Sequence, residues 1–360
     1  MSRILSVGKA VPPYQLSQEA SQKLVYELFR DRFPQIDRLM RIFPNSEIRT
    51  RHFCVPAEWF LRDHSFAEKN EQYLAEACRL GAEAIQRCLQ KCALSPEAID
   101  CLIFVSSTGI ATPSIDARIL NLLGMREDVT RIPLWGLGCA AGAMGLARAN
   151  DYAKAHPERL VLLLAVELCG LTFVKRDISK SNFVATSLFA DGAAAVLIAG
   201  ERYARLHPAF ADAPAIVGSV STTWRDSLDV MGWDVTDDGL RVIFSRDIPA
   251  LVKQRMGQTV EQALARHQLT LRQISRFLPH PGGAKVIAAY RETLGLPAES
   301  TRDAEEVLAE YGNMSSATVL YVLERSLARH WASGEYGLLT ALGPGFSSEV
   351  VILQAGGERG

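Results

Sequence analysis

The order of predicted helices and strands in the first half of this 360-residue chain recurs in its second half. Residues 71–105 predict an amphipathic helix, a break at "SPEA" and an apolar strand, "IDCLIFVSS". Residues 249–280 repeat that order, and "AIQRCLQKCALSPEAIDCLIFV" aligns with "TVEQALARHQLTLRQISRFLPH" without a gap, which pairs Val105 with His280. A repeat of this length favours a fold built from two copies of one α/β unit.

A second landmark, the run of small residues in "GLGCAAGAMG", strengthens the repeat. This run begins a predicted helix at Cys139, and "YGNMSSATVLYVLERSLARH" begins another at Asn313, which lies 313 − 139 = 174 residues later. Each helix leads to an apolar strand and then to a strand preceded by glycine. Because small side chains let helix backbones approach closely, we expect both helices in a buried central layer. We predict an N-terminal half over residues 1–205 and a C-terminal half over 206–360.

Two such halves, packed about a pseudo-twofold axis, would bring Cys139, His280 and Asn313 together. A thiol at a helix N-terminus lies at the positive end of the helix dipole, which favours the thiolate. His280 follows a predicted strand and stands between two prolines, and its cation would lower the thiol pKa further. Each residue alone is more often structural: a buried thiol, a core histidine, an N-cap. Their joint placement favours a nucleophilic site.

Composition narrows the classes of function. Lys and Arg number 39 against 40 Asp and Glu, and the sequence has no basic run and no apolar segment of about 18 residues. We therefore expect no nucleic-acid partner and no membrane span. The seven cysteines form no CxxC pair, which suits a reducing compartment and predicts a cytoplasmic protein. Cys88 and Cys92, one helical turn apart, could form a metal or redox pair, but two packed thiols are favoured.

The order Cys, His, Asn also fits a papain-like protease, because His280 lies 280 − 139 = 141 residues after Cys139. That alternative lacks a "CGSCW"-like surround, and the cysteine is far from the N-terminus.

Five motifs together, "GLGCAAG", "SLFADGAAAVLI", "HPGG", "YGNMSSATV" and "GPGFSSE", resemble those of the thiolase superfamily. More narrowly, the chain is similar to type III polyketide synthases of the chalcone synthase kind, from about residue 5 to 355. The resemblance implies an α/β thiolase fold with duplicated αβαβα layers. It also implies Cys139 as the acyl-accepting nucleophile, with His280 and Asn313 donating hydrogen bonds to a thioester carbonyl. Decarboxylation of a malonyl thioester leaves an enolate, and an enolate oxygen needs such donors.

The resemblance extends to residues around this centre. Phe189 matches a gatekeeper phenylalanine and Val242 stands where a second aromatic gatekeeper is usual, which implies a wider or more aliphatic passage. The other matched chamber positions are Thr172, Ala185, Trp233 and Ser315. Thr112 matches a position that reaches into the neighbouring subunit, which implies a homodimer. Arg38 and Arg41 match a basic stretch that binds CoA phosphates, although solvated helix charges are an equally good interpretation.

The phrase "TGIATPSIDARI" resembles bacterial members that use fatty acyl starters. It implies condensation of a fatty acyl-CoA, or an acyl carrier protein thioester, with malonyl-CoA, and cyclisation to an alkylpyrone or alkylresorcinol. CoA thioesters are then substrates, and no metal or other cofactor is expected. Two alternatives stay open: a single condensation like that of ketoacyl-ACP synthase III, and a catalytically silent thiolase-fold binding protein.

Overall fold

Strands and helices alternate through most of the chain in a computed structural model that describes residues 1–33 and 35–356. The strands are β1 (Ser2–Ala10), β2 (Tyr14–Ser17), β3 (Thr50–Phe53), β4 (Cys101–Ser106), β5 (Thr130–Trp135), β6 (Leu160–Leu168), β7 (Asp191–Ala199), β8 (Ala215–Thr223), β9 (Met231–Thr236), β10 (Gly239–Phe244), β11 (Ile274–Pro279), β12 (Tyr336–Gly343) and β13 (Ser347–Gln354). The α-helices are α1 (Gln18–Phe29), α2 (Ile36–Met40), α3 (Phe66–Gln90), α4 (Ile115–Leu123), α5 (Ala141–Ala155), α6 (Lys180–Leu188), α7 (Glu201–Leu206), α8 (Ile248–Ala265), α9 (Ala284–Leu294), α10 (Arg302–Tyr311) and α11 (Ser316–Leu327).

The predicted repeat is visible in the main sheet, whose order is β11-β12-β13-β8-β1-β7-β6-β4-β5. The two halves of this sheet have the same strand order, because β4-β6-β7-β1 in one half corresponds to β11-β12-β13-β8 in the other. The pairs β4/β6 and β11/β12 are parallel, whereas β6/β7 and β12/β13 are antiparallel. The two halves join where Ser2 and Arg3 of β1 pair with Ile216 and Ala215 of β8. The duplicated α/β architecture is confirmed.

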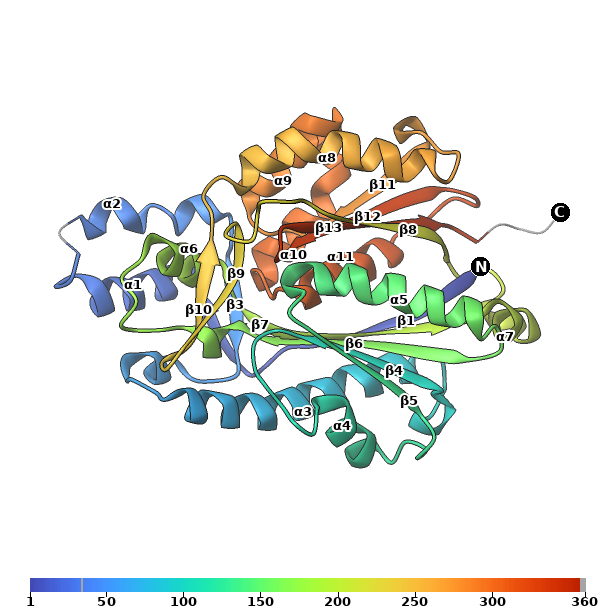
Figure 1. Ribbon diagram of the computed structural model, residues 1–360, viewed down its shortest axis with the longest axis horizontal. Coiled ribbons are helices and arrows are strands. Elements are labelled where there is room, and N and C mark those ends of the chain that lie inside the picture. Colours follow the sequence, from blue (N-terminus) through green and yellow to red (C-terminus); the bar gives the residue numbers. More distant parts are fainter. Residues whose placement is uncertain (34, 357–360) are drawn as a thin grey trace.

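Helices lie between and outside the two halves of this sheet, as Figure 1 shows. In the centre, α5 and α11 pack against each other and against strands of both halves. On one outer face α3 and α4 pack on the first half, and on the other α8 and α9 pack on the second. Strand β6 shows how the sequence permits this, because Leu163 faces the central helices while Leu162 and Leu164 face α3. The αβαβα layering is confirmed.

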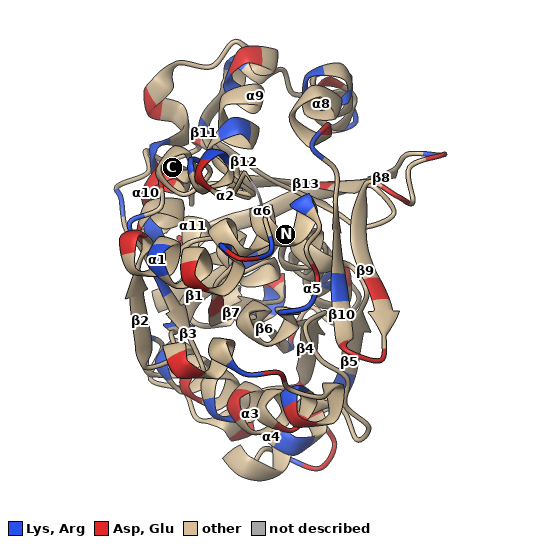
Figure 2. Ribbon diagram, turned by 90° about the vertical axis from the view of Figure 1, so that its left-hand side faces the viewer, with Lys and Arg blue, Asp and Glu red and all other residues tan. Residues whose placement is uncertain are grey.

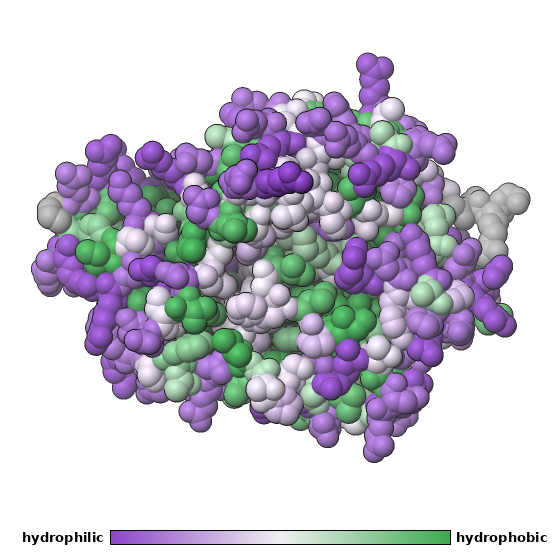
Figure 3. All heavy atoms as spheres, viewed as in Figure 1, coloured by the Kyte–Doolittle hydropathy of each residue, from purple (hydrophilic) through white to green (hydrophobic). Residues whose placement is uncertain are grey.

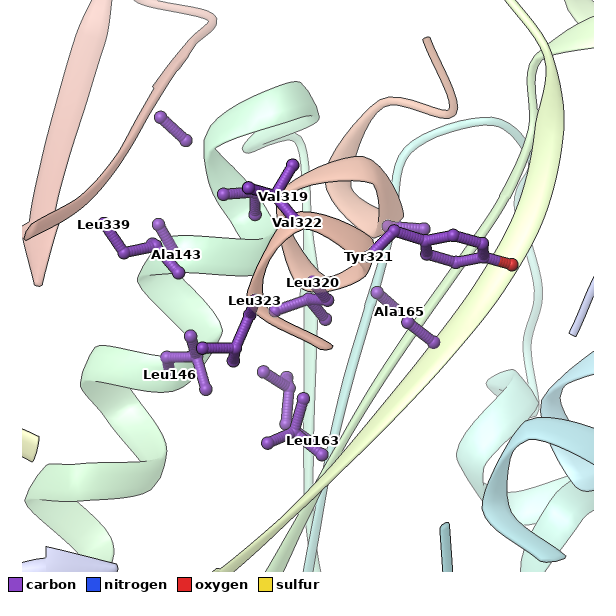
Figure 4. Close-up of a cluster of buried hydrophobic side chains, with 14 of the residues drawn as sticks. Ala143, Leu146, Leu163, Ala165, Val319, Leu320, Tyr321, Val322, Leu323 and Leu339 are labelled. Atoms are coloured by element: carbon purple, nitrogen blue, oxygen red, sulfur yellow. The ribbon is translucent and has the colours of Figure 1, made fainter. Parts of the chain in front are cut away.

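Small residues bring the two central helices together, as expected. A Cβ atom added at Gly142 of α5 would lie 2.2 Å from the carbonyl oxygen of Ser316 in α11. One added at Gly145 would lie 2.5 Å from Leu163 of β6. Figure 4 shows Val319 and Leu323 of α11 beside α5 in the resulting cluster. The glycines therefore permit an approach that any larger residue would prevent.

Figure 2 shows Lys and Arg positions interspersed with Asp and Glu positions along the helices and loops of the ribbon. Within the described part of the chain, no helix is long and apolar enough to cross a membrane. Within the same described residues, no group of three or more His, Cys, Asp or Glu side chains is arranged so that it could hold a metal ion. Cys88 is buried with its Sγ 3.1 Å from Ser6 Oγ, so this thiol is packed in the core.

Candidate active site

Cys139 lies in a single 3-10 turn, Gly138–Ala140, that leads directly into α5. The turn needs glycine at 138, where φ is +48° and an added Cβ would lie 2.6 Å from Pro344. The Cys139 side chain is buried, and its thiol donates to the Ser315 hydroxyl over 3.5 Å. The predicted placement of the thiol at a helix start is thus confirmed.

His280 follows the last residue of β11, as predicted. Its backbone N–H donates to the carbonyl of Thr340 on β12 at 2.7 Å, and its own carbonyl accepts from Gly282 at 3.0 Å. These bonds fix the backbone at the strand end. Both ring nitrogens are buried and have no hydrogen-bond partner within residues 1–33 and 35–356. Because buried polar atoms are normally paired, this imidazole is available to a bound ligand.

Asn313 lies between α10 and α11, so α11 begins three residues later than the sequence suggested. Its backbone N–H donates to Leu188 at 2.8 Å and its carbonyl accepts from Ala190 at 2.9 Å. The side-chain Oδ1 accepts from the Ser315 N–H at 2.9 Å, and Nδ2 lies 3.4 Å from the Gly282 carbonyl. The backbone therefore holds the residue on both sides, and because Nδ2 donates to Gly282 and Oδ1 accepts from Ser315, one amide N–H is left as the available donor.

The protonation states differ from the sequence-based expectation. Burial raises the pKa of the Cys139 thiol to about 12, although hydrogen bonding with Ser315 and Asn313 opposes the shift. Burial also lowers the pKa of His280 to about 3. Without a bound ligand, desolvation therefore favours the neutral thiol and the neutral imidazole. Burial thus opposes the thiolate that the helix start and the His280 cation were expected to favour, and the nucleophilic role of Cys139 stays a prediction.

Glu167 is a buried carboxylate near this centre that was not predicted from the sequence. Glu167, at the end of β6, accepts hydrogen bonds from the Ser107 N–H at 3.0 Å and the Ser316 hydroxyl at 2.6 Å. Burial raises its pKa, and its charge contributes to the raised pKa of Cys139. Within the apolar strand "RLVLLLAVEL" no motif distinguished this glutamate from a surface residue.

Cys139 faces two adjoining hollows, which we call together the inner cavity. One, of about 310 Å³, is lined by Cys139, His280 and Asn313. The other, of about 340 Å³, is lined by Cys139, Trp233 and Ser315. The structure thus brings together the three residues that the duplicated sequence predicted. Ser315 has a φ of +46°, a strained conformation for a residue with a side chain.

Phe189 and Val242 lie between the inner cavity and a second hollow of about 580 Å³, which we call the outer cavity. Thr172 and Ala185 line this outer cavity. Its apolar wall includes Leu16, Leu24, Val25, Leu28, Phe53 and Phe60. The matched chamber positions therefore divide between two cavities on either side of Phe189.

The passage beside Phe189 is more aromatic than Val242 alone suggested. The Phe244 ring, two residues along β10 from Val242, lies 6.3 Å from the Phe189 ring in an edge-on contact. Trp233, opposite Val242 in the β9–β10 hairpin, makes a similar contact at 6.2 Å. The expectation of a wider, more aliphatic passage was incomplete, because alternate residues of one strand face the same way and Phe244 supplies bulk.

A surface groove of about 1140 Å³ adjoins the inner cavity and shares Phe244 and Gly282 with it. The groove carries three cations that the sequence analysis did not identify: Lys180, Arg246 and Lys285.

The remaining matched residues lie on the surface. Arg38 in α2 and Arg41 at its end are exposed and precede Ile42 in the groove wall. Thr112 is exposed in the loop between β4 and α4 and is not among the residues lining the cavities described here.

Comparison with known proteins identifies the family. The model for chalcone and stilbene synthases, N-terminal domain, matches residues 1–202, and the model for the C-terminal domain matches residues 216–356. A Bacillus subtilis protein named "Putative chalcone synthase" is 46% identical over 358 residues, which is 98% of each chain. A "1,3,6,8-tetrahydroxynaphthalene synthase" of Streptomyces peucetius is 38% identical, covering 98% of this chain and 92% of its own.

A solved structure supports the same family. The crystal structure of the 1,3,6,8-tetrahydroxynaphthalene synthase from Streptomyces coelicolor, a bacterial type III polyketide synthase, has a TM-score of 0.92 at 27% identity. That match covers 99% of this chain and 100% of the other. These findings set aside the papain-like and silent binding-protein alternatives. The chain belongs to the chalcone and stilbene synthase family of type III polyketide synthases, acyltransferases of thiolase-like fold that condense malonyl-CoA iteratively.

Proposed function

We propose that this enzyme loads a fatty acyl group onto Cys139, extends it with malonyl units, and cyclises the product to an alkylpyrone or alkylresorcinol. The observation that carries the proposal is the outer cavity, whose largely apolar wall lies across Phe189 from the nucleophile. An alkyl chain gains about 0.8 kcal/mol for each methylene that it buries. A cavity of this lining therefore favours a medium or long alkyl starter over an aromatic one.

Loading begins with the neutral Cys139 thiol and His280. His280 accepts the thiol proton as Sγ attacks the thioester carbonyl of the acyl-CoA. The carbon–sulfur bond to CoA then breaks, and the proton passes to the departing CoA thiolate. Proton transfer at the moment of attack is needed because burial disfavours a resting thiolate. The acyl group remains on Cys139 with its alkyl chain directed past Phe189.

Extension needs an enolate, and His280 and Asn313 supply the donors. Malonyl-CoA loses CO₂, and the electron pair of the broken bond passes onto the thioester oxygen. One N–H of neutral His280 and one of the Asn313 amide donate to that oxygen. The enolate carbon then attacks the acyl-Cys139 thioester, which expels the cysteine sulfur as a thiolate and leaves a β-ketoacyl-CoA two carbons longer. The thiolate takes up a proton or attacks this thioester to begin the next round. Neutral donors suit a site where burial penalises ions.

CoA enters along the surface groove in this proposal. Lys180, Arg246 and Lys285 would meet its phosphates, with Arg38 and Arg41 at the nearby rim. A carrier-protein thioester could be delivered by the same route. Replacing Lys285 with Gln should raise the KM for malonyl-CoA and leave kcat close to the wild-type value.

We also propose a homodimer that buries the loop carrying Thr112. Ile110 in this loop is 45% exposed, and Trp135, whose indole N–H donates to Gly109 at 3.0 Å, is 53% exposed. Apolar side chains gather in the middle of the face in Figure 3, and hydrophilic ones surround them. Exposed apolar area of this kind is typical of interfaces. Sedimentation should give about twice the 39.5 kDa chain mass.

A second candidate product follows from the relative that is 38% identical, which is named as a tetrahydroxynaphthalene synthase. Tetrahydroxynaphthalene carries no alkyl chain, so such an activity would need no fatty acyl starter.

One experiment separates these candidates. Purified enzyme is incubated with malonyl-CoA and, in parallel, with acyl-CoAs of increasing length, benzoyl-CoA, or no starter, and products are analysed by mass spectrometry. We expect alkyl products extended more than once, and a higher kcat/KM for medium or long acyl-CoAs than for benzoyl-CoA. Efficient turnover of malonyl-CoA alone would favour the second candidate. A product extended only once would indicate a single-condensation enzyme.

A further inference from the structure

Arg51 is a buried cation that none of the steps above uses. It lies in β3, is 2% exposed and contributes to the wall of the outer cavity. Its Nη1 donates to two carbonyl oxygens, those of Thr186 at 2.6 Å and Phe189 at 2.9 Å. Both carbonyls belong to the last turn and C-terminus of α6, where helix carbonyls lack partners within the helix. The guanidinium therefore caps α6 at the point where the chain turns into Phe189.

The segment that Arg51 caps also holds Asn313. Leu188 accepts a hydrogen bond from the Asn313 N–H, and Ala190 donates one to the Asn313 carbonyl. The side-chain stem of Arg51 packs against Gly312, where an added Cβ would lie 2.8 Å from Arg51 Cγ and φ is +71°. Arg51 thus contacts both of the chain segments that are joined by the isolated β-bridge between Phe189 and Asn313.

A cation is suited to this position. Burial lowers the pKa of Arg51 to about 9 while the Asp191 carboxylate opposes the shift, so the guanidinium stays charged at neutral pH. A positive charge at a helix C-terminus is favoured by the helix dipole, and charge-assisted hydrogen bonds are stronger than neutral ones. The planar guanidinium can also bond two carbonyls at once, which a lysine ammonium does with less fixed geometry.

We propose that Arg51 is a positioning residue that sets both the gate at Phe189 and the Asn313 amide beside Cys139. The inference rests on the enolate-stabilising role proposed above for Asn313. Arg51 acts through the backbone of residues 188–190 and does not touch the reacting atoms. Its removal moves the Asn313 donor away from the developing charge, so it lowers the rate of decarboxylation more than it weakens malonyl-CoA binding.

The test compares Arg51→Met with Arg51→Lys and with a matched control, Lys69→Met. Lys69 is also buried, and its Nζ likewise donates to two carbonyls, those of Phe173 and Asp238, each at 2.9 Å. It contacts neither Phe189 nor Asn313 by hydrogen bond. Both Met variants therefore lose a buried cation and two hydrogen bonds, but only one loses the cap on α6.

Decarboxylation of malonyl-CoA without a starter is measured first. We expect kcat to fall on the order of 10- to 100-fold in Arg51→Met with KM within about twofold, since misplacement near 1 Å can cost this much. Arg51→Lys should lie between that variant and the wild type, and Lys69→Met should stay within about twofold of the wild type. Equal losses in both Met variants, or an unchanged kcat in Arg51→Met, would overturn the proposal.

Amide hydrogen exchange gives a readout that needs no substrate. The Ala190 N–H, bonded to the Asn313 carbonyl, should exchange faster in Arg51→Met and at the wild-type rate in Lys69→Met. If wild-type enzyme did not decarboxylate malonyl-CoA, the proposed function would fail, and this exchange rate would still decide whether Arg51 holds the segment. Unchanged protection of Ala190 in Arg51→Met would refute the positioning role.

Discussion

The cavities on the two sides of Phe189 differ in what their walls contain. The inner cavity has Cys139, His280 and Asn313 in its wall, with His280 and Asn313 held by backbone hydrogen bonds. The outer cavity is mainly apolar, and Arg51, the one cation among the described residues that line it, faces helix carbonyls. In the proposed mechanism, the groups that make bonds and the surface that accommodates the alkyl chain therefore lie on opposite sides of the passage at Phe189 and Val242. Changes on one side should therefore affect chemistry, and changes on the other should affect the choice of starter.

The largest expected effect lies in the inner cavity. Asn313→Ala removes a donor directed at the developing enolate, and such losses typically cost 10²–10³ in rate, so we expect that order of decrease in decarboxylation and in extension. Malonyl-CoA decarboxylation and product formation are assayed on the same preparation. Asn150→Ala is the matched control, because Asn150 is equally buried and accepts from Ser2 away from both cavities. Extension lost with decarboxylation intact would assign Asn313 another role.

The protonation state of the inner cavity gives the next largest effect. Because the pKa of Cys139 is raised to about 12, its thiolate fraction should increase about tenfold per pH unit from pH 6 to 9. The rate of Cys139 alkylation by iodoacetamide, followed by mass spectrometry of its peptide, should rise in the same proportion. A rate independent of pH above 6 would show a resting thiolate.

The smallest effect is expected from the outer cavity. Ala185→Leu places extra bulk in its wall and should shift the preferred starter to shorter chains. At about 0.8 kcal/mol per buried methylene, kcat/KM should fall about fourfold for each methylene that the cavity no longer holds. Decarboxylation of malonyl-CoA is the internal control and should remain unchanged. An equal loss for all starter lengths would mean that the alkyl chain lies elsewhere.

Much of the fold and the central residues could be predicted from the sequence because the chain is duplicated. The repeat placed Cys139 and Asn313 at matching helix starts and His280 at a strand end, and the structure brings all three to one cavity. The burial of α5 could be predicted because its small residues lie together in one stretch of the sequence. The boundary between residues 205 and 206 stays a prediction.

What escaped prediction depends on contacts between distant segments. Glu167 accepts hydrogen bonds from hydroxyl groups in α11 and in the loop that follows β4. Arg51 donates to a carbonyl at the end of α6. No local pattern distinguishes such residues from surface charges. The raised pKa of Cys139 likewise follows from how completely the fold buries it, which a helix-start motif does not reveal. Phe244 lies against Phe189 because of the register of the β9–β10 hairpin, which the sequence alone does not define.

The central claim is that chain holding and enolate formation belong to different groups within one cavity, and Cys139→Ala tests it most directly. The variant lacks the nucleophile but retains His280 and Asn313. The measurement is release of CO₂ and acetyl-CoA from malonyl-CoA, with and without an acyl-CoA starter, and a folding check by circular dichroism. We predict that decarboxylation remains measurable while every extended product disappears. Loss of decarboxylation in the folded variant would contradict the account, because it would make the thiol itself necessary for enolate formation.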